Sequence, residues 1–264
     1  MWKLALHTWT LDTTPLSEVL RVAKATGWDA IELRRLDFKR AQEAGQSPAQ
    51  VLDLVKGSGL AVACVGVEVG WMFAEGAERG RLLEAFAESC GWAKALGCAT
   101  VMSPVDRGRG DAERAVESLR EVGQIAAKHS VRLALEANSQ AEQFNTLDRI
   151  REILRRADHA HCGVLLDTYH LQRSGGTLRD LETLTRQELV YFQYSDVPAH
   201  GLKAGAVLDR LPPGRGTVPF RNLFVWLAKH YSGYLSYEAP NPAAWARDPE
   251  AVAREALTAT RTLW

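Results

Sequence analysis

The sequence predicts a single α/β domain of the (β/α)8 TIM barrel class, in which eight parallel strands close into a ring with helices outside. Short apolar stretches rich in β-branched residues alternate with longer segments whose apolar residues recur at helical spacing. The chain has 264 residues, of which 46% are hydrophobic, and such barrels commonly take about 250 residues. The stretch HTWTLDTTP after the first expected strand lacks the glycine-rich turn that is usual in the rival open, doubly wound sheet.

Eight stretches are expected to form the strands. Each is short, apolar or β-branched, and followed by polar or turn-forming residues. Their ranges are 3–8, 29–33, 60–67, 99–103, 131–136, 162–167, 189–195 and 233–238.

Helices are expected between these strands. The first begins with Pro15 and ends with Gly27, which are common start and stop signals. The other clear helices are expected at 79–97, 110–129, 145–157, 218–231 and 248–263. Shorter helices are expected near 47–58 and 177–186. Since no linker or low-complexity segment interrupts the pattern, one domain is expected to span residues 1–264.

Composition narrows the classes of function. Lys+Arg and Asp+Glu each total 32, so the net charge is zero and no nucleic-acid-binding surface is expected. No apolar run approaches the roughly 18 residues of a membrane span, and MWKLALHTW is too short for a signal peptide. The four cysteines are scattered without CxxC pairs, which is typical of reduced thiols in a cytoplasmic protein. They are Cys64, Cys90, Cys98 and Cys162.

Carboxylates stand at the ends of three expected strands. LALEAN, VLLDTYH and LSYEAP each place an acid after an apolar run, and these acids are Glu136, Asp167 and Glu238. In a barrel of this class the strand ends carry the function at one face. A single such acid is usually a salt-bridge partner or a helix cap, but three crowded acids repel one another unless a cation neutralises them. The pattern therefore favours a divalent metal ion.

Gln193 lies on the strand between those that end in Asp167 and Glu238, and it supplies a neutral oxygen. With Glu136, the four side chains form a donor set made only of oxygen. Such a set favours Mn²⁺, with Mg²⁺ or Co²⁺ as alternatives, over structural zinc, which prefers nitrogen and sulfur.

Several motifs, taken in order, resemble the xylose-isomerase-like barrel superfamily. Within it, the chain is similar to the sugar phosphate isomerases and epimerases, a branch that includes inosose isomerase, hydroxypyruvate isomerase and ketose 3-epimerases. Each motif is short, but their order and their positions at strand ends make the combination specific. They are HTWTLDTTPLSEVLRVAKATGWDAIELR, LALEAN followed by FNTL, GVLLDTYHLQRSGG, YFQYSDVP, RLPPGRGTVPF and YLSYEAPNPAAW.

The resemblance implies one divalent metal ion held from strands five to eight by Glu136, Asp167, Gln193 and Glu238. Many relatives have histidine where this chain has Gln193, whereas the hydroxypyruvate-isomerase-like ones share the glutamine. The resemblance also implies isomerisation or epimerisation of a keto-sugar, inosose or related polyhydroxy carbonyl compound through a metal-stabilised enediolate. Glu136 and Glu238 are then expected to be the catalytic acid/base pair.

Further residues are expected to bind the substrate. In DTYH, His170 lies just beyond Asp167, at a position where relatives bind a substrate hydroxyl; fixing Asp167 is the alternative role. Four more residues are expected near the mouth of the barrel: His7, Glu68, Trp71 and Arg215. Each also has a role without substrate. His7 would be a core histidine and Glu68 an ion-pair partner. Trp71 would pack in the core, and Arg215 would be a surface residue.

Three other functions are compatible with parts of this pattern. A lyase of the inosose or dehydroshikimate dehydratase type would show the same metal carboxylates. A DNA-repair endonuclease of the same superfamily would need many strand-end histidines and a basic surface, which the sequence lacks. A non-catalytic sugar-binding barrel is disfavoured because all four ligand positions hold coordinating side chains. The expected partner is a small sugar-like molecule, and a homo-oligomer is expected because relatives commonly form one.

Overall fold

Eight parallel strands close into a barrel in chain order, β1 to β8, in the computed structural model, which describes residues 2–263. This confirms the fold class expected from the sequence. Each strand agrees with its expected range to within a residue at either end. The strands are Lys3–His7, Ala30–Leu33, Ala61–Gly66, Thr100–Pro104, Arg132–Glu136, Cys162–Asp167, Leu189–Tyr194 and Tyr234–Tyr237.

The chain divides into two compact units. The first contains the residues up to 63 and those from 192 onward, and the second contains residues 64–191. The expectation of one domain over 1–264 stays a prediction, and its two end positions lie outside the described residues.

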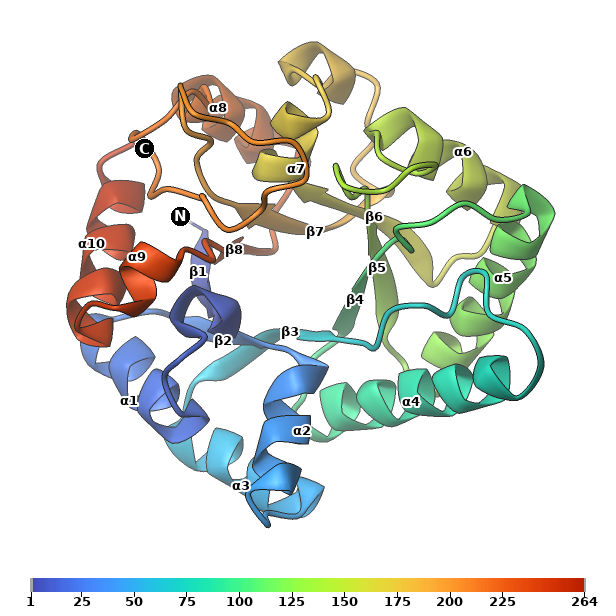
Figure 1. Ribbon diagram of the computed structural model, residues 1–264, viewed down its shortest axis with the longest axis horizontal. Coiled ribbons are helices and arrows are strands. Elements are labelled where there is room, and N and C mark those ends of the chain that lie inside the picture. The colour runs from blue at the N-terminus through green and yellow to red at the C-terminus, as the bar shows by residue number, and fades with distance from the viewer. Residues whose placement is uncertain (1, 264) are drawn as a thin grey trace. The chain divides into compact units, whose positions relative to one another are not determined.

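In the first unit, β1 pairs with β2 and β8, and β7 pairs with β8. Helix α1 packs against α10 and α3 (Figure 1). The residue directly after it, Gly27, caps the helix, and its φ of 91° favours glycine. The sequence did not predict the first 3₁₀ turn, α2 or α9. The helical elements of this unit are η1 (Thr8–Leu11), α1 (Leu16–Thr26), α2 (Arg35–Glu43), α3 (Pro48–Ser58), α8 (Phe220–His230), α9 (Pro242–Trp245) and α10 (Pro249–Arg261).

In the second unit, β4 pairs with β3 and β5, and β5 pairs with β6. Helix α5 packs between α4 and α6 on the outside of these strands (Figure 1). The helix expected near 177–186 is instead a single 3₁₀ turn, and the unexpected α7 begins directly after β6. The helical elements of this unit are α4 (Gly76–Ala95), α5 (Ala112–Lys128), α6 (Leu147–Ala157), α7 (Thr168–Arg173) and η2 (Leu178–Leu181).

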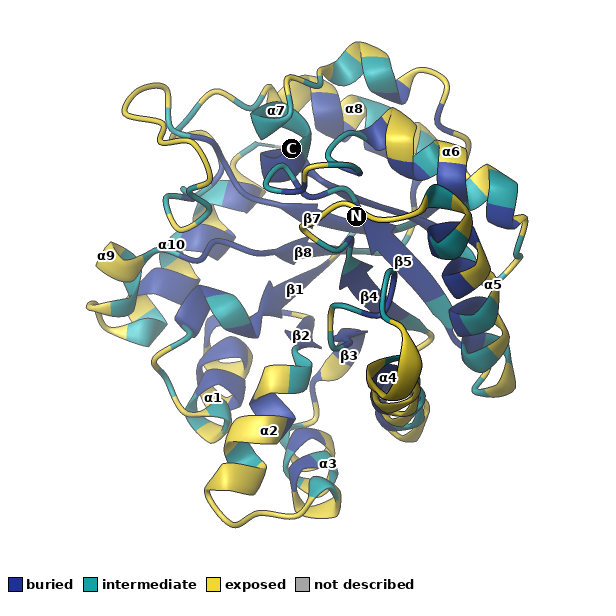
Figure 2. Ribbon diagram, turned by 45° about the vertical axis from the view of Figure 1, so that its right-hand side comes forward, coloured by how far each residue is buried: buried dark blue, intermediate teal, exposed yellow. Residues whose placement is uncertain are grey.

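Burial explains why the strands are apolar along their length. Figure 2 shows buried strands, and helices that are buried on one side and exposed on the other. Leu4, Leu6, Ile31 and Leu33 are almost inaccessible, as expected where both faces of a parallel sheet are covered. Each such side chain contributes about 1.5–3 kcal/mol when buried. Within residues 2–263, the helices lack the combination of length and apolar character needed to cross a membrane.

The strand register brings polar residues to the carboxyl ends of neighbouring strands. His7 at the end of β1 lies opposite Glu32 of β2. Glu136 ends β5 opposite Pro104 of β4, and Glu238 directly follows β8. Polar side chains therefore gather where each apolar run stops.

Gly163 on β6 tests how tightly the second unit is packed. A Cβ atom added there would lie 2.4 Å from Val190 Cγ2 and 2.7 Å from the carbonyl oxygen of Glu188. We expect Gly163→Ala to lower the free energy of unfolding by about 1–3 kcal/mol, because the close backbone oxygen cannot rotate away. Urea unfolding followed by circular dichroism measures the change.

Gly57 on α3 is the matched control, since a Cβ atom there would meet nothing within 4 Å. Gly57→Ala should raise the unfolding free energy by about 0.5–1 kcal/mol. If both variants shifted in the same direction, the packing argument for β6 would be wrong.

Candidate functional site

A buried cluster lies at the ends of β5 and β6 in the second unit. We call it the β5–β6 cluster, and it consists of Glu136, Asp167 and His170. Each offers one ligand atom, and these atoms all lie within 4.8 Å of one another. Atoms so spaced can surround one divalent ion with bonds of about 2.0–2.6 Å. The carboxylates of Glu136 and Asp167 therefore fit a metal ion.

Asp167 also caps the helix that follows it. Its Oδ1 atom accepts a hydrogen bond of 2.7 Å from the backbone N–H of Tyr169. A carboxylate at a helix N-terminus satisfies an otherwise unpaired donor and suits the helix dipole. The cap explains why the chain turns directly from β6 into α7, which carries His170 into the same cluster as Asp167.

The hydrogen bonds of His170 favour a donor role for this ring. Its Nδ1 atom accepts the backbone N–H of Ser139 at 3.2 Å and lies 2.9 Å from Ser139 Oγ. Because a backbone N–H can only donate, the proton of the neutral ring is on Nε2. His170 can therefore donate from Nε2 to an oxygen, which suits a substrate hydroxyl better than a metal ion.

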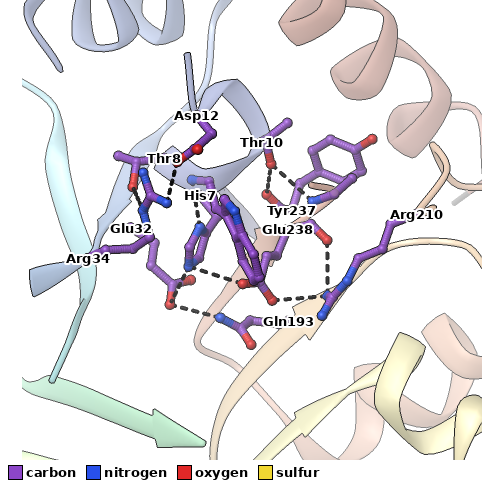
Figure 3. Close-up of polar contacts among 12 residues, drawn as sticks. His7, Thr8, Thr10, Asp12, Glu32, Arg34, Gln193, Arg210, Tyr237 and Glu238 are labelled. Carbon is purple, nitrogen blue, oxygen red and sulfur yellow. Dashed lines mark hydrogen bonds and ion pairs between the residues drawn. The ribbon is translucent and has the colours of Figure 1, made fainter. Parts of the chain in front are cut away.

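A second buried cluster lies in the first unit, and Figure 3 shows its polar contacts. We call it the β1–β8 cluster. Its members are all 5% exposed or less, although each has a charged or strongly polar side chain. They are His7, Glu32, Gln193, Arg210 and Glu238.

The side-chain amide of Gln193 on β7 has a hydrogen-bond partner for its nitrogen, but its oxygen has none among the described residues. Its Nε2 atom donates to Glu32 Oε1 at 2.9 Å. Its Oε1 atom is fully buried and has no hydrogen-bond partner among residues 2–263. Buried carbonyl oxygens without partners are uncommon in proteins. An oxygen in this state fits a ligand that is not part of the chain.

His7 lies between two carboxylates (Figure 3). Its Nε2 atom is 3.4 Å from Glu238 Oε1 and 3.7 Å from Glu32 Oε1. Its Nδ1 atom accepts the backbone N–H of Trp9 at 3.0 Å, so the neutral ring carries its proton on Nε2. Burial lowers the pKa of His7 well below 6.5, and the charges of Arg34 and Arg210 act in the same direction. Both ring nitrogens face protein groups, and the expected substrate contact stays a prediction.

Arg210 binds Glu238, and the sequence analysis missed it. Its side chain is 1% exposed, and Nη1 donates to Glu238 Oε2 at 3.0 Å and to the backbone oxygen of Glu238 at 3.2 Å. Arg215, which was expected to bind substrate, is exposed on the same segment. In the run LDRLPP an acid precedes Arg210 and a leucine follows it, so the local sequence provides little signal that Arg210 is buried.

Asp196 organises the segment that carries Arg210. Its carboxylate accepts four backbone N–H groups at 2.8–2.9 Å, those of Val197, Gly214, Gly216 and Val218. Its backbone also pairs with that of Leu211 in both directions. A Cβ atom at Gly216 would lie 2.1 Å from the carbonyl oxygen of Val197, so this close approach requires glycine. These contacts fix the chain directly after Arg210.

Glu68 and Trp71 take positions that agree with their ordinary alternatives. Glu68 forms a partly exposed ion pair of 2.7 Å with Arg81 of α4. Trp71 is buried, and its Nε1 atom donates to Ser103 Oγ at 2.9 Å. The expected substrate contacts of these two residues stay predictions.

Comparison with known proteins identifies relatives of the chain. The profile of the xylose isomerase-like TIM barrel family matches residues 20–263. A 3-dehydroshikimate dehydratase of Pseudomonas putida is 27% identical over 241 residues, which cover 86% of this chain and 36% of that protein. An inosose isomerase of Halalkalibacterium halodurans is 26% identical over 147 residues, which cover 55% of this chain and 52% of that protein.

The chain thus spans about a third of the length of the dehydratase and about half that of the isomerase. Among solved structures, the IolI protein with a bound zinc atom superposes with a TM-score of 0.88 at 19% sequence identity. That match covers 99% of this chain and 97% of the IolI chain. It supports the fold.

Arg210 and Arg215 provide a test of the β1–β8 cluster. We expect Arg210→Met to lower the unfolding free energy by about 3–5 kcal/mol, because Glu238 loses the cation that compensates its buried charge. Arg215→Met should change it by less than about 0.5 kcal/mol, since Arg215 is exposed. Urea unfolding of both variants measures the difference, and equal losses would contradict the assignment.

Proposed function

Because the chain belongs to the xylose isomerase-like TIM barrel family, we propose that it is a divalent-metal-dependent isomerase or epimerase of a small polyhydroxy keto compound. The observation that carries the proposal is the buried Gln193 oxygen, which lacks a hydrogen-bond partner among the described residues. Glu136 and Asp167, buried with ligand atoms within 4.8 Å of each other, supply carboxylates of the kind such an ion needs. Inosose isomerase and dehydroshikimate dehydratase relatives support a substrate of this class.

The proposed ligands are Glu136, Asp167, Gln193 and Glu238. They stand at or next to the carboxyl ends of four consecutive strands, β5 to β8, which is the end of a barrel where active sites are built. The set contains only oxygen donors, so we propose Mn²⁺, with Mg²⁺ or Co²⁺ as alternatives. When bound, the ion would polarise the carbonyl and hydroxyl oxygens of the substrate and stabilise the negative charge that develops on them.

Proton transfer is assigned to two glutamates. We assign removal of the proton to Glu238, whose carboxylate is oriented by Arg210 at Oε2 and faces the Nε2–H group of His7 at Oε1. We assign the return of the proton to Glu136, which would place the two acid/base groups on separate strands. His170 would donate from Nε2 to a substrate hydroxyl. Burial of these side chains limits competition from water.

A dehydratase is the second candidate, favoured by the 86% of this chain that aligns with the Pseudomonas putida enzyme. Elimination begins with the same step, in which a carboxylate removes a proton from the carbon next to a carbonyl. The C–O bond at the adjacent carbon then breaks, and the leaving hydroxyl takes a proton from an acid and departs as water. Both reactions need the same residues for their first step.

Metal dependence is tested by thermal unfolding of the chelated protein. Mn²⁺ at about 100 times its dissociation constant should stabilise the wild type by about 2.7 kcal/mol through mass action, and Asp167→Asn should lose most of this gain. Glu78→Gln, which alters an exposed ion pair with Arg81, is the control and should respond as the wild type does. A wild type that no divalent ion stabilises would overturn the proposed metal centre.

Proton transfer is tested with ketoses, inososes and 3-dehydroshikimate in deuterated water. The wild type should exchange hydrogen next to a carbonyl, and Glu238→Gln should slow this by about 10²–10⁴-fold, the usual contribution of a general acid or base. Glu255→Gln, which alters a partly exposed ion pair between α10 and Arg247, is the control. A product of unchanged composition apart from deuterium indicates an isomerase or epimerase, whereas loss of one water indicates a dehydratase. An exchange rate unaffected by Glu238→Gln would remove that residue from the mechanism.

A further inference from the structure

Glu32 is fully buried in the β1–β8 cluster, although the proposed chemistry uses it neither as a ligand nor as a base. Its Oε1 atom accepts the amide N–H of Gln193 at 2.9 Å and lies 3.7 Å from His7 Nε2. Burying a carboxylate is costly unless it is paired, so its contacts need an explanation. Figure 3 shows Glu32 on the side of the Gln193 amide that carries the nitrogen.

The orientation of the Gln193 amide decides whether it can bind a cation. The amide has an oxygen that accepts and a nitrogen that only donates, so only the oxygen can bind a metal ion. With the amide reversed, Gln193 Oε1 would stand where Nε2 now lies, 2.9 Å from a carboxylate oxygen. Two oxygens at that distance repel, and the amide nitrogen would lose its acceptor. Glu32 therefore selects one of the two orientations.

His7 keeps Glu32 in an accepting role. The Nδ1 atom of His7 is occupied by the backbone N–H of Trp9, which leaves the ring proton on Nε2, the atom that faces Glu32 and Glu238. Glu32 Oε1 thus has the Gln193 amide at hydrogen-bond distance and the Nε2–H of His7 nearby. Because the Gln193 nitrogen is the end of the amide that donates to Glu32, the Gln193 Oε1 atom lies on the other side (Figure 3) and has no hydrogen-bond partner among residues 2–263.

We propose that Glu32 is a positioning residue that holds the Gln193 oxygen ready for a divalent ion. This rests on the proposed function, because it requires that Gln193 be a metal ligand. Glu32 acts through the amide and does not itself touch the ion. By excluding the reversed amide, it keeps the Gln193 oxygen available as the fourth donor to the ion.

The experiment measures Mn²⁺ affinity of the chelated protein by titration, using the electron paramagnetic resonance signal of unbound Mn²⁺. Glu32→Gln, which is nearly isosteric, should weaken binding by about 10-fold, the lower end of the usual effect of residues that orient metal ligands. In the Gln193→Leu background, Glu32→Gln should have no further effect, since no amide remains to be oriented. Glu255→Gln is the control for loss of a negative charge in the same unit and should bind as the wild type does.

An exchange of the two side chains gives a second arm. In Glu32→Gln/Gln193→Glu, the introduced amide can donate to the introduced carboxylate, so the bond between them is kept with its direction reversed. Mn²⁺ affinity should return at least to the wild-type value. This arm also shows whether weak binding by Glu32→Gln comes from misfolding, because the exchange variant keeps the same substitution at position 32.

The outcomes separate this inference from the function on which it rests. If the wild type binds no Mn²⁺, the proposed metal centre fails. If the wild type binds and Glu32→Gln binds equally well, only the role of Glu32 fails. If Glu32→Gln weakens binding by the same factor with Gln193 and with leucine at position 193, Glu32 acts through its charge alone, and the positioning role is overturned.

Discussion

A carboxylate buried at the end of a strand must be neutralised or hydrogen-bonded, and the local structure of both units follows from this requirement. In the second unit, Asp167 accepts a hydrogen bond from the backbone N–H of Tyr169, and α7 starts at that point. In the first unit, Glu238 accepts a hydrogen bond from the guanidinium of Arg210, and Glu32 accepts one from the side-chain amide of Gln193. These contacts determine where the chain turns and which side chains are held rigidly.

The same requirement gives the segment after β7 its shape. Arg210 reaches Glu238 only if the chain around it is fixed, and the four N–H groups bound by the Asp196 carboxylate fix it. The carboxylates of Asp196 and Glu238 are both buried. Asp196 binds backbone N–H groups, whereas Glu238 is held by the side chain of Arg210. Asp196 thus fixes the segment after Arg210, and Arg210 in turn holds the Glu238 carboxylate.

The sequence was sufficient for the barrel because strand positions depend on local patterns. An apolar run ending in an acid marks β5, β6 and β8 almost to the residue. Which side chains pair with one another depends on contacts between residues far apart in the sequence. Glu32 and Gln193, for example, are 161 positions apart. The substrate role expected of Arg215 from the PPGRG loop stays a prediction, whereas the pairing of buried Arg210 with Glu238 is visible only in the structure. Helix α7 was missed because its start depends on the cap supplied by Asp167.

Glutamine places a demand on a metal site that an acid does not. A carboxylate presents an oxygen whichever way its last bond turns, whereas an amide that turns over presents a hydrogen-bond donor and repels a cation. A chain that uses glutamine as a ligand therefore needs a fixed acceptor for its nitrogen, buried deeply enough that water cannot replace it. Glu32 meets both conditions, since it and Gln193 are each 0% exposed and joined at 2.9 Å. In the proposed metal site, Gln193 and the buried acid that orients its amide would therefore act together.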